Sequence, residues 1–242
     1  MSKTVATRGH SGKRNNATRP QLSRAEVVAT ALRIIDIEGF HALTMRALAR
    51  KLDVFPTAVY WHAGTKSELL ALISEEVLQE IQVPETDECD WKEWILLLGL
   101  RSRDVLGRHP RFAAYFVTNI QVSLGSLRLA DTVLGILSRA GFQGEDLADA
   151  YNVLFGSIFG WTGGELAEGL QDEAVNADKK ELERLLAEAD TTELLNIREN
   201  WSVLANRAYM MRWTSGSTQP MDSSFKLMLR TLIDGVASKL TG

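Results

Sequence analysis

The stretch LTMRALARKLDVFPTAVYWHAGTKSELL, residues 43–70, decides the fold of this chain. Its apolar residues recur at helical spacing, and Pro56 suits the first turn of a helix. We predict a helix to about residue 52, a tight turn, a second helix over 56–62 and a third from about residue 66. Seven apolar positions can meet in a small core: Met45, Leu48, Ala49, Leu52, Val54, Val59 and Leu69. This pattern is typical of a helix-turn-helix, whose second helix offers side chains to base edges and phosphates.

Charge is divided unevenly along the chain. Residues 1–66 hold 11 Lys and Arg against 4 Asp and Glu, a local charge of +7, whereas residues 67–242 hold 16 against 27, a local charge of −11. A basic end on an acidic body indicates that one end approaches a polyanion. A run of charges is often only a solvated face of the protein. The asymmetry indicates nucleic-acid binding mainly because the basic end coincides with the helix-turn-helix pattern.

The remaining sequence predicts an all-α protein. Residues 1–20 have almost no apolar content and carry five basic residues, so we expect a disordered arm that either lies along DNA or only solubilises the chain. Ser23 and Glu26 form a capping-box pattern at the start of the next helix. We predict a helix-turn-helix domain over 21–66 and a larger helical effector-binding and dimerisation domain over 67–242. Further helices are expected over about 146–168, 196–213 and 223–240.

Residues 23–82 resemble the DNA-binding domain of the TetR family of bacterial transcriptional regulators. The resemblance is carried by Gly39, the run from Leu43 to Ala49, Val54, Val59-Tyr60-Trp61-His62 and Lys66-Ser67-Glu68-Leu69-Leu70. The Tyr-Trp-His triplet followed by Lys66 is especially similar to the tetracycline repressor subgroup. This resemblance implies a homodimeric repressor that a small ligand releases from DNA.

Eight residues are the predicted contacts to double-stranded DNA. Thr44 begins a helix, where its hydroxyl and free backbone N–H groups can meet a phosphate, and Arg46 can reach a guanine edge. Thr57 and Ala58 open the recognition helix, and the resemblance implies phosphate contacts further along. The full set is Thr44, Arg46, Thr57, Ala58, Tyr60, Trp61, His62 and Lys66. Phe55 either packs on a base methyl group or folds back on the core, so the sequence leaves the operator unreadable.

A dimer and an effector cavity are predicted in the acidic body. Two copies spaced one helical turn apart would read a near-palindromic operator. The resemblance favours a four-helix interface from residues 146–168 and 223–240, with Gly156, Gly160 and Gly163 allowing close approach. The alternative is that the apolar faces of these helices only seal the core of the monomer. The matching stripe is Phe225, Met228, Leu232, Val236 and Leu240. A mostly apolar cavity is predicted from Trp94, Leu98, Arg101, Phe112, Phe116, Asn119, Phe155, Phe159, Trp201 and Met210.

Composition restricts the other classes of function. The four histidines lack metal-ligand spacing, and no nucleophile-elbow or nucleotide-binding loop is present, so we expect no enzyme, cofactor or metal. The lone Cys89, the polar start and the lack of a membrane-length apolar run predict a soluble cytoplasmic protein. The alternatives are a ligand-independent DNA-binding regulator or activator and a protein-interaction module.

Overall fold

The computed structural model describes residues 22–85, 88–118, 123–166, 179–190, 192–205, 207–208 and 221–240. Within these residues every regular element is a helix, which confirms the predicted all-α class. The predicted basic arm, residues 1–20, lies outside the described residues. The amino-terminal helices are α1 (Arg24–Glu38), η1 (Phe40–Ala42), α2 (Met45–Leu52), α3 (Pro56–Ala63) and α4 (Lys66–Gln79).

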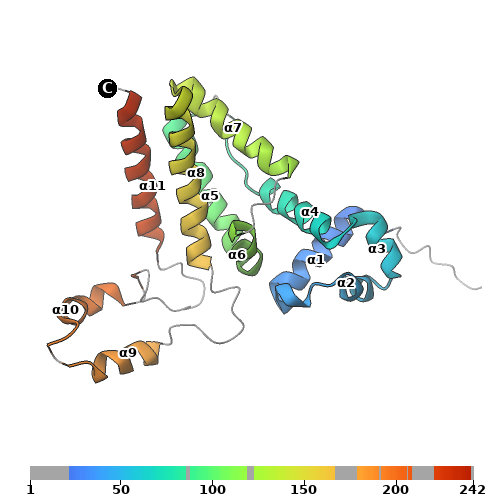
Figure 1. Cartoon of the computed structure of the whole chain (residues 1–242), viewed down its shortest axis with the longest axis horizontal. Helices are drawn as coiled ribbons and strands as arrows, with labels where there is room; N and C mark the ends of the chain where they lie inside the picture. The colour runs from blue at the N-terminus through green and yellow to red at the C-terminus, as the bar shows by residue number, and fades with distance from the viewer. Residues whose placement is uncertain are drawn as a thin grey trace, which may run out of the picture.

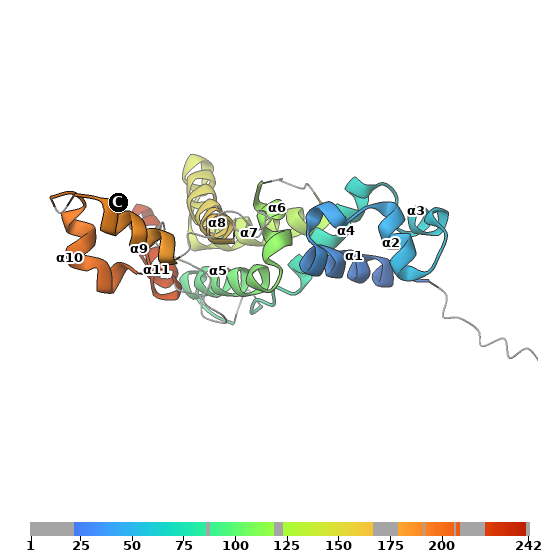
Figure 2. The same cartoon turned by 90° about the horizontal axis from the view of Figure 1, so that it is seen from below.

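The larger part of the chain forms a helical body. Figures 1 and 2 show α1–α4 at one end of the molecule, the body in the middle, and α9 and α10 as a pair on the far side. The body and this pair consist of α5 (Trp91–Arg108), α6 (Pro110–Thr118), α7 (Leu124–Ala140), α8 (Gly144–Leu166), α9 (Lys179–Glu188), α10 (Leu195–Leu204), α11 (Asp222–Ala237) and η3 (Ser238–Leu240). No helix among the described residues is long and apolar enough to cross a membrane.

Side chains at the helix starts explain where several helices begin. Ser23 Oγ accepts a hydrogen bond from the Glu26 amide at 3.1 Å, so the predicted cap of α1 is confirmed. The full reciprocal capping box occurs at α4, where Thr65 Oγ1 accepts from the Glu68 amide and the Glu68 carboxylate accepts from the Thr65 amide at 2.7 Å. These bonds satisfy backbone donors that the first turn of a helix leaves free.

One predicted boundary differs from the structure. The helix expected over 196–213 is shorter, because α10 ends at Leu204. Helix α5 ends at Arg108 and α6 begins at Pro110. Proline fits the first turn of α6, where its missing N–H is not needed.

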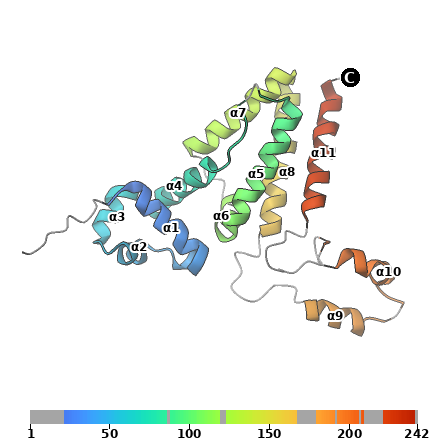
Figure 3. The same ribbon diagram turned by 180° about the vertical axis from the view of Figure 1, so that it is seen from behind.

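The helix-turn-helix end and the body meet through polar contacts. His109 Nδ1 lies 2.8 Å from Asp36 Oδ2 on α1, and Arg111 donates to the Ile37 carbonyl at 2.8 Å. Arg108 pairs with Glu80 just beyond α4 at 2.6 Å. Figure 3 shows α4 lying between the amino-terminal helices and α7, and α4 packs against both α1 and α7. The boundary predicted at residue 66 stays a prediction, since the helix that follows it belongs to both units.

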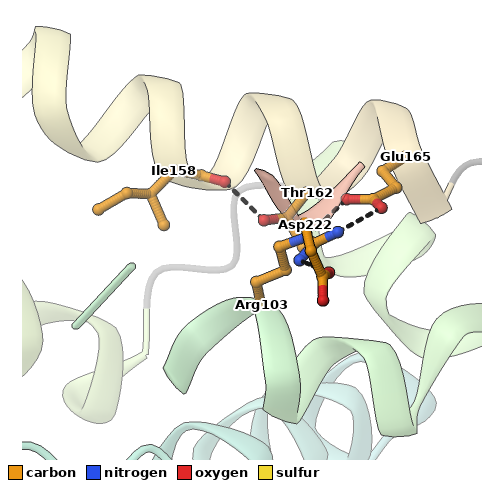
Figure 4. Close-up of polar contacts among 5 residues, drawn as sticks. All are labelled: Arg103, Ile158, Thr162, Glu165 and Asp222. Atoms are coloured by element: carbon orange, nitrogen blue, oxygen red, sulfur yellow. Dashed lines mark hydrogen bonds and ion pairs between the residues drawn. The ribbon is translucent and has the colours of Figure 1, made fainter. Parts of the chain in front are cut away.

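A buried ion pair joins three helices of the body (Figure 4). Arg103 on α5 makes two hydrogen bonds to Glu165 near the end of α8, at 2.6 and 2.7 Å, and one to Asp222 at the start of α11, at 2.5 Å. The Arg103 and Glu165 side chains are 7% and 8% exposed. The Arg103 guanidinium also lies 4.9 Å from the centre of the Phe225 ring. Burial disfavours the charge, but the two carboxylates outweigh it and raise the pKa of Arg103.

Candidate nucleic-acid interface and effector cavity

The turn between α2 and α3 has the geometry that a helix-turn-helix requires. Thr44 caps α2, because its Oγ1 accepts from the Ala47 amide at 3.1 Å. Asp53 adopts the left-handed conformation, with φ of 53°, and ends α2. The Val54 amide then returns to the Ala49 carbonyl at 3.0 Å. This closed turn sets the direction in which α3 leaves.

The recognition helix α3 divides cleanly into an inner and an outer face. Val59 and Ala63 are 0% and 3% exposed, whereas Tyr60 and Trp61 are 52% and 79% exposed. Gly64 ends the helix at a φ of 66°, a conformation that favours glycine. Arg24 on α1 donates to the carbonyl at residue 62 at 3.0 Å and so ties the end of α3 to α1. The outer side chains are therefore presented on a fixed scaffold.

The structure places all eight predicted DNA-contacting residues between the start of α2 and the start of α4. Arg46 and Thr57 are exposed and Ala58 is half-buried. His62 is half-buried and meets the Trp61 ring edge-on. Lys66 Nζ lies 5.3 Å above the ring of Phe40, a contact that positions its ammonium group.

Five of these eight residues line two surface hollows. Thr44 and Arg46 line one hollow with Arg50 and Pro56, and Tyr60, Trp61 and His62 line a second. Arg50 is absent from the predicted set. Its i,i+4 spacing from Arg46 is the sequence signal that would have found it.

Phe55 is a residue whose placement the sequence left open. Its side chain is 82% exposed, so it does not fold back on the core. Phe55 is the N-cap of α3, and its side chain makes no capping hydrogen bond. This exposure excludes the alternative that Phe55 packs on the core and leaves the alternative that it packs on a base methyl group.

The body contains an apolar cavity of about 230 Å³ next to α4. Ten residues from four helices line it: Leu78, Phe116, Val117, Ser126, Leu127, Leu129, Ala130, Tyr151, Phe155 and Phe159. Aromatic rings form one wall, since Tyr151 stacks on Phe155 at 5.0 Å between centroids and Phe155 lies 4.5 Å from Phe159. Burial raises the pKa of Tyr151, whose hydroxyl therefore stays neutral and can donate a hydrogen bond.

Phe116, Phe155 and Phe159 are the predicted pocket residues that line this cavity. Trp94, Leu98 and Phe112 are packed in the core instead, each at most 1% exposed. Trp94 donates its indole N–H to the Pro84 carbonyl at 2.8 Å, and Arg101 donates to the Gln82 carbonyl, so both fasten the segment between α4 and α5.

The other predicted pocket residues lie elsewhere. Trp201 lies on α10, in the pair of helices set apart from the body (Figures 1 and 2). Asn119 and Met210 fall outside the described residues. Helical spacing identifies aromatic residues that point inward, but it does not separate those that face a cavity from those that face packed neighbours.

The glycines of α8 have different surroundings. Gly163 is buried, and a Cβ added there would lie 2.3 Å from Cγ2 of Val117 on α6. Gly156 and Gly160 are exposed, with nothing within 4 Å of an added Cβ. Gly163 therefore allows α8 to pack closely on α6 within the chain, which corrects its expected place at an interface. At Gly156 and Gly160 the surface of α8 is exposed.

The predicted apolar stripe of α11 is divided in the same way. Phe225 and Val236 are buried in the core of the chain, at 0% and 8% exposed. Met228 and Leu232 are half-buried, and Leu240 is 38% exposed. A hollow between α8 and α11 is lined by Asp149, Ala150, Val153, Thr231, Leu232, Gly235, Val236 and Lys239. The outer side of these two helices therefore combines small and apolar residues with the ion pair of Asp149 and Lys239, whose charged atoms are 3.3 Å apart.

A helix-turn-helix joined to a larger all-helical body is an arrangement typical of DNA-binding transcriptional regulators. Residues 27–73 match the family model described as bacterial regulatory proteins, tetR family, and residues 83–240 match the tetracyclin repressor-like C-terminal domain. The chain belongs to the TetR family of DNA-binding transcriptional regulators.

Individual relatives agree with this assignment. An HTH-type transcriptional regulator of Saccharopolyspora erythraea is 30% identical over 179 residues, which span 72% of this chain and 76% of that protein. The class A tetracycline repressor protein of Escherichia coli is 27% identical over 216 residues, covering 88% and 89%. A possible TetR family regulator from Streptomyces coelicolor A3(2) has a similar structure, with a TM-score of 0.70 and 27% identity over 90% of this chain and 100% of that one.

Proposed function

We propose that this chain is a homodimeric repressor, without catalytic activity, that acts in the bacterial cytoplasm and leaves its operator when a small apolar ligand binds. The observation that carries the proposal is the position of α4. Lys66, at its start, directly follows the recognition helix, and Leu78, in its last turn, lines the apolar cavity. A ligand that enlarges the cavity would press on the far end of α4 and tilt α3 away from DNA.

Release from DNA requires the ligand to bind more tightly to the conformation that does not fit DNA. A ligand with equal affinity for both conformations does not shift the equilibrium between them. The cavity walls suit an uncharged, aromatic or polycyclic molecule. The Tyr151 hydroxyl supplies a polar group of the kind that orients a ligand in such sites, whereas the Ser126 hydroxyl is engaged with Ser123 in the cap of α7.

N-phenyl-1-naphthylamine, a neutral apolar dye, tests the cavity directly. We expect its fluorescence to rise with the wild-type chain and not with Ala130→Phe, which fills the cavity from α7. Tyr115→Phe, a change on α6 outside the cavity lining, serves as the control variant. If both variants bind the dye like the wild type, the cavity is not the effector site, and the ligand-independent regulator becomes the better proposal.

DNA binding is tested with duplexes enriched from a random library by the full-length chain. Arg46→Ala should weaken binding and relax the preference for one base, whereas Tyr60→Ala should weaken binding to all sequences alike. Lys51→Ala is the control, because Lys51 is engaged by Glu38 at 2.8 Å on the same domain. Unchanged affinity in Arg46→Ala and Tyr60→Ala would contradict the proposed interface.

The proposed dimer uses the outer side of α8 and α11. Gly156 and Gly160 allow a second helix to approach closely, and Val153 and Leu227, 40% and 67% exposed, supply apolar area beside them. Gly160→Arg should convert a dimer into a monomer in sedimentation experiments without lowering the helix content. Lys180→Arg, on the separate pair of helices, should leave the dimer intact. A wild-type monomer at micromolar concentration would overturn this part of the proposal.

A further inference from the structure

Phe55 has no structural role that accounts for its presence at the start of the recognition helix. Among the described residues it is the most exposed large apolar side chain, at 82%. Its carbonyl accepts from the Ala58 amide at 2.9 Å, so the backbone begins α3 without help from the ring. Short polar side chains are favoured at an N-cap because they bond the free amides, which phenylalanine cannot do. The ring neither caps the helix nor packs on the core.

The surroundings of Phe55 are basic. Its chain neighbours Val54 and Pro56 line a hollow together with Thr44, Ala49, Arg46 and Arg50, and no acidic residue lines it. Thr44 adds the amino-terminal end of α2, which favours negative charge. An exposed aromatic ring whose two chain neighbours line a hollow with two arginines therefore lies where a polyanion with an apolar edge would fit.

We propose that Phe55 reads thymine, packing its ring against the C5 methyl group in the major groove. This inference rests on the proposed DNA-binding function and names a base that the site prefers. The first residues of a recognition helix reach the base edges, and the thymine methyl is the apolar group that the major-groove edge offers. Pro56 restrains the backbone beside the ring, with Phe55 held at φ −71° and ψ 145°. The backbone that carries the ring is thus fixed before DNA binds.

Replacing thymine by uracil tests the contact, because this change removes the C5 methyl and leaves every hydrogen-bonding group in place. The duplex is one enriched from a random library by the full-length chain, with each thymine changed to deoxyuridine in turn. We expect the change at one thymine in each half-site to lower the affinity of the wild-type protein for the duplex about fourfold. This factor corresponds to ~0.8 kcal/mol for one buried methyl group. Phe55→Ala should bind the thymine and uracil duplexes equally.

Two further variants separate the contact from folding. Phe55→Ser supplies a good N-cap, so it should unfold at the same temperature as the wild type or higher while also losing the thymine preference. Ile37→Ala removes another exposed apolar side chain of the same domain, 68% exposed at the end of α1, and should keep the thymine preference. Retention of this preference by Ile37→Ala and its loss in both Phe55 variants would support the assignment.

Four results would overturn the assignment of Phe55 to thymine. A penalty for uracil that persists in Phe55→Ala would assign the methyl contact to another residue. Weaker binding by Phe55→Ala without any uracil effect would indicate that the ring inserts between bases, and an altered oligomeric state would indicate a protein contact. If the wild type enriches no DNA at all, the proposed function itself fails, and this assignment fails with it.

Discussion

Arg103→Met tests how the body of this regulator is held together. The substitution keeps an unbranched side chain of similar length but removes the guanidinium that joins α5, α8 and α11. Glu165, 8% exposed, then keeps a buried carboxylate without its main cation, while Asp222, 56% exposed, can rehydrate. Breaking a buried pair by removing one partner costs about 3–5 kcal/mol of the free energy of unfolding. For a chain of this size that cost lowers the midpoint of thermal unfolding by roughly 6–20 °C.

The chain contains a matched control for this prediction. Arg184 on α9 makes the same kind of contact, with hydrogen bonds to Glu181 at 2.6 and 2.7 Å and to Glu188 at 2.5 Å. Its side chain is 51% exposed, so water already solvates the charges and Arg184→Met should lower the midpoint far less than Arg103→Met does. The two arginines make similar two-carboxylate contacts, but Arg184 is exposed and pairs only within α9, whereas Arg103 is buried and joins three helices.

Thermal unfolding followed by circular dichroism at 222 nm measures both variants. A double variant, Arg103→Met with Glu165→Gln, should recover most of the lost stability, because no charge is then left buried at that position. The reasoning is refuted if Arg103→Met shifts the midpoint no more than Arg184→Met does, or if the double variant is less stable than the single one.

Three further predictions concern the domain junction, α8 and the DNA interface. The hydrogen bond that His109 donates to the Asp36 carboxylate on α1 raises the pKa of His109 above 6.5 in the folded chain. The stabilisation that this bond gives is therefore fully present below about pH 6.5 and is lost as pH rises through the folded pKa. His109→Gln should therefore lower the free energy of unfolding, measured with urea, by about 1–2 kcal/mol at pH 6 and by much less at pH 9. An equal decrease at both pH values would contradict this. Gly163→Ala should destabilise by about 1–3 kcal/mol through its clash with α6, whereas Gly135→Ala on α7, with only the Arg139 guanidinium 3.5 Å from an added Cβ, should stabilise by up to about 1 kcal/mol in the same assay. Equal effects of the two substitutions would contradict this. Lys66→Ala should reduce by about 1 the slope of log affinity against log salt, measured by fluorescence anisotropy, and an unchanged slope would exclude a phosphate contact.

Local patterns allowed much of this fold to be predicted. The cap at Ser23, the turn before Pro56 and the glycine at Gly64 depend on a few neighbouring residues, so their chemistry is visible in the sequence. The predicted residues of the helix-turn-helix lie close together because this unit is short and its contacts are local.

Cavity and interface residues could not be predicted in the same way. Trp94 and Phe155 both lie at inward positions of amphipathic helices, yet Trp94 is packed in the core and Phe155 faces a cavity. Gly160 and Gly163 lie three residues apart on one helix, and only Gly163 is covered by α6. Helical periodicity defines the direction of a side chain, whereas its neighbours depend on how distant helices pack.

The sequence by itself determined that this chain is all-α, that it carries a helix-turn-helix and that its basic end differs from its acidic body. Those properties follow from local propensity, capping and composition. Only the tertiary structure decided that Phe55 is exposed, that α4 reaches from the recognition helix to an apolar cavity, and that Arg103 pairs with Glu165 across 62 residues of chain. Contacts between residues distant in sequence arise when helices pack, and no local pattern records which partners will meet.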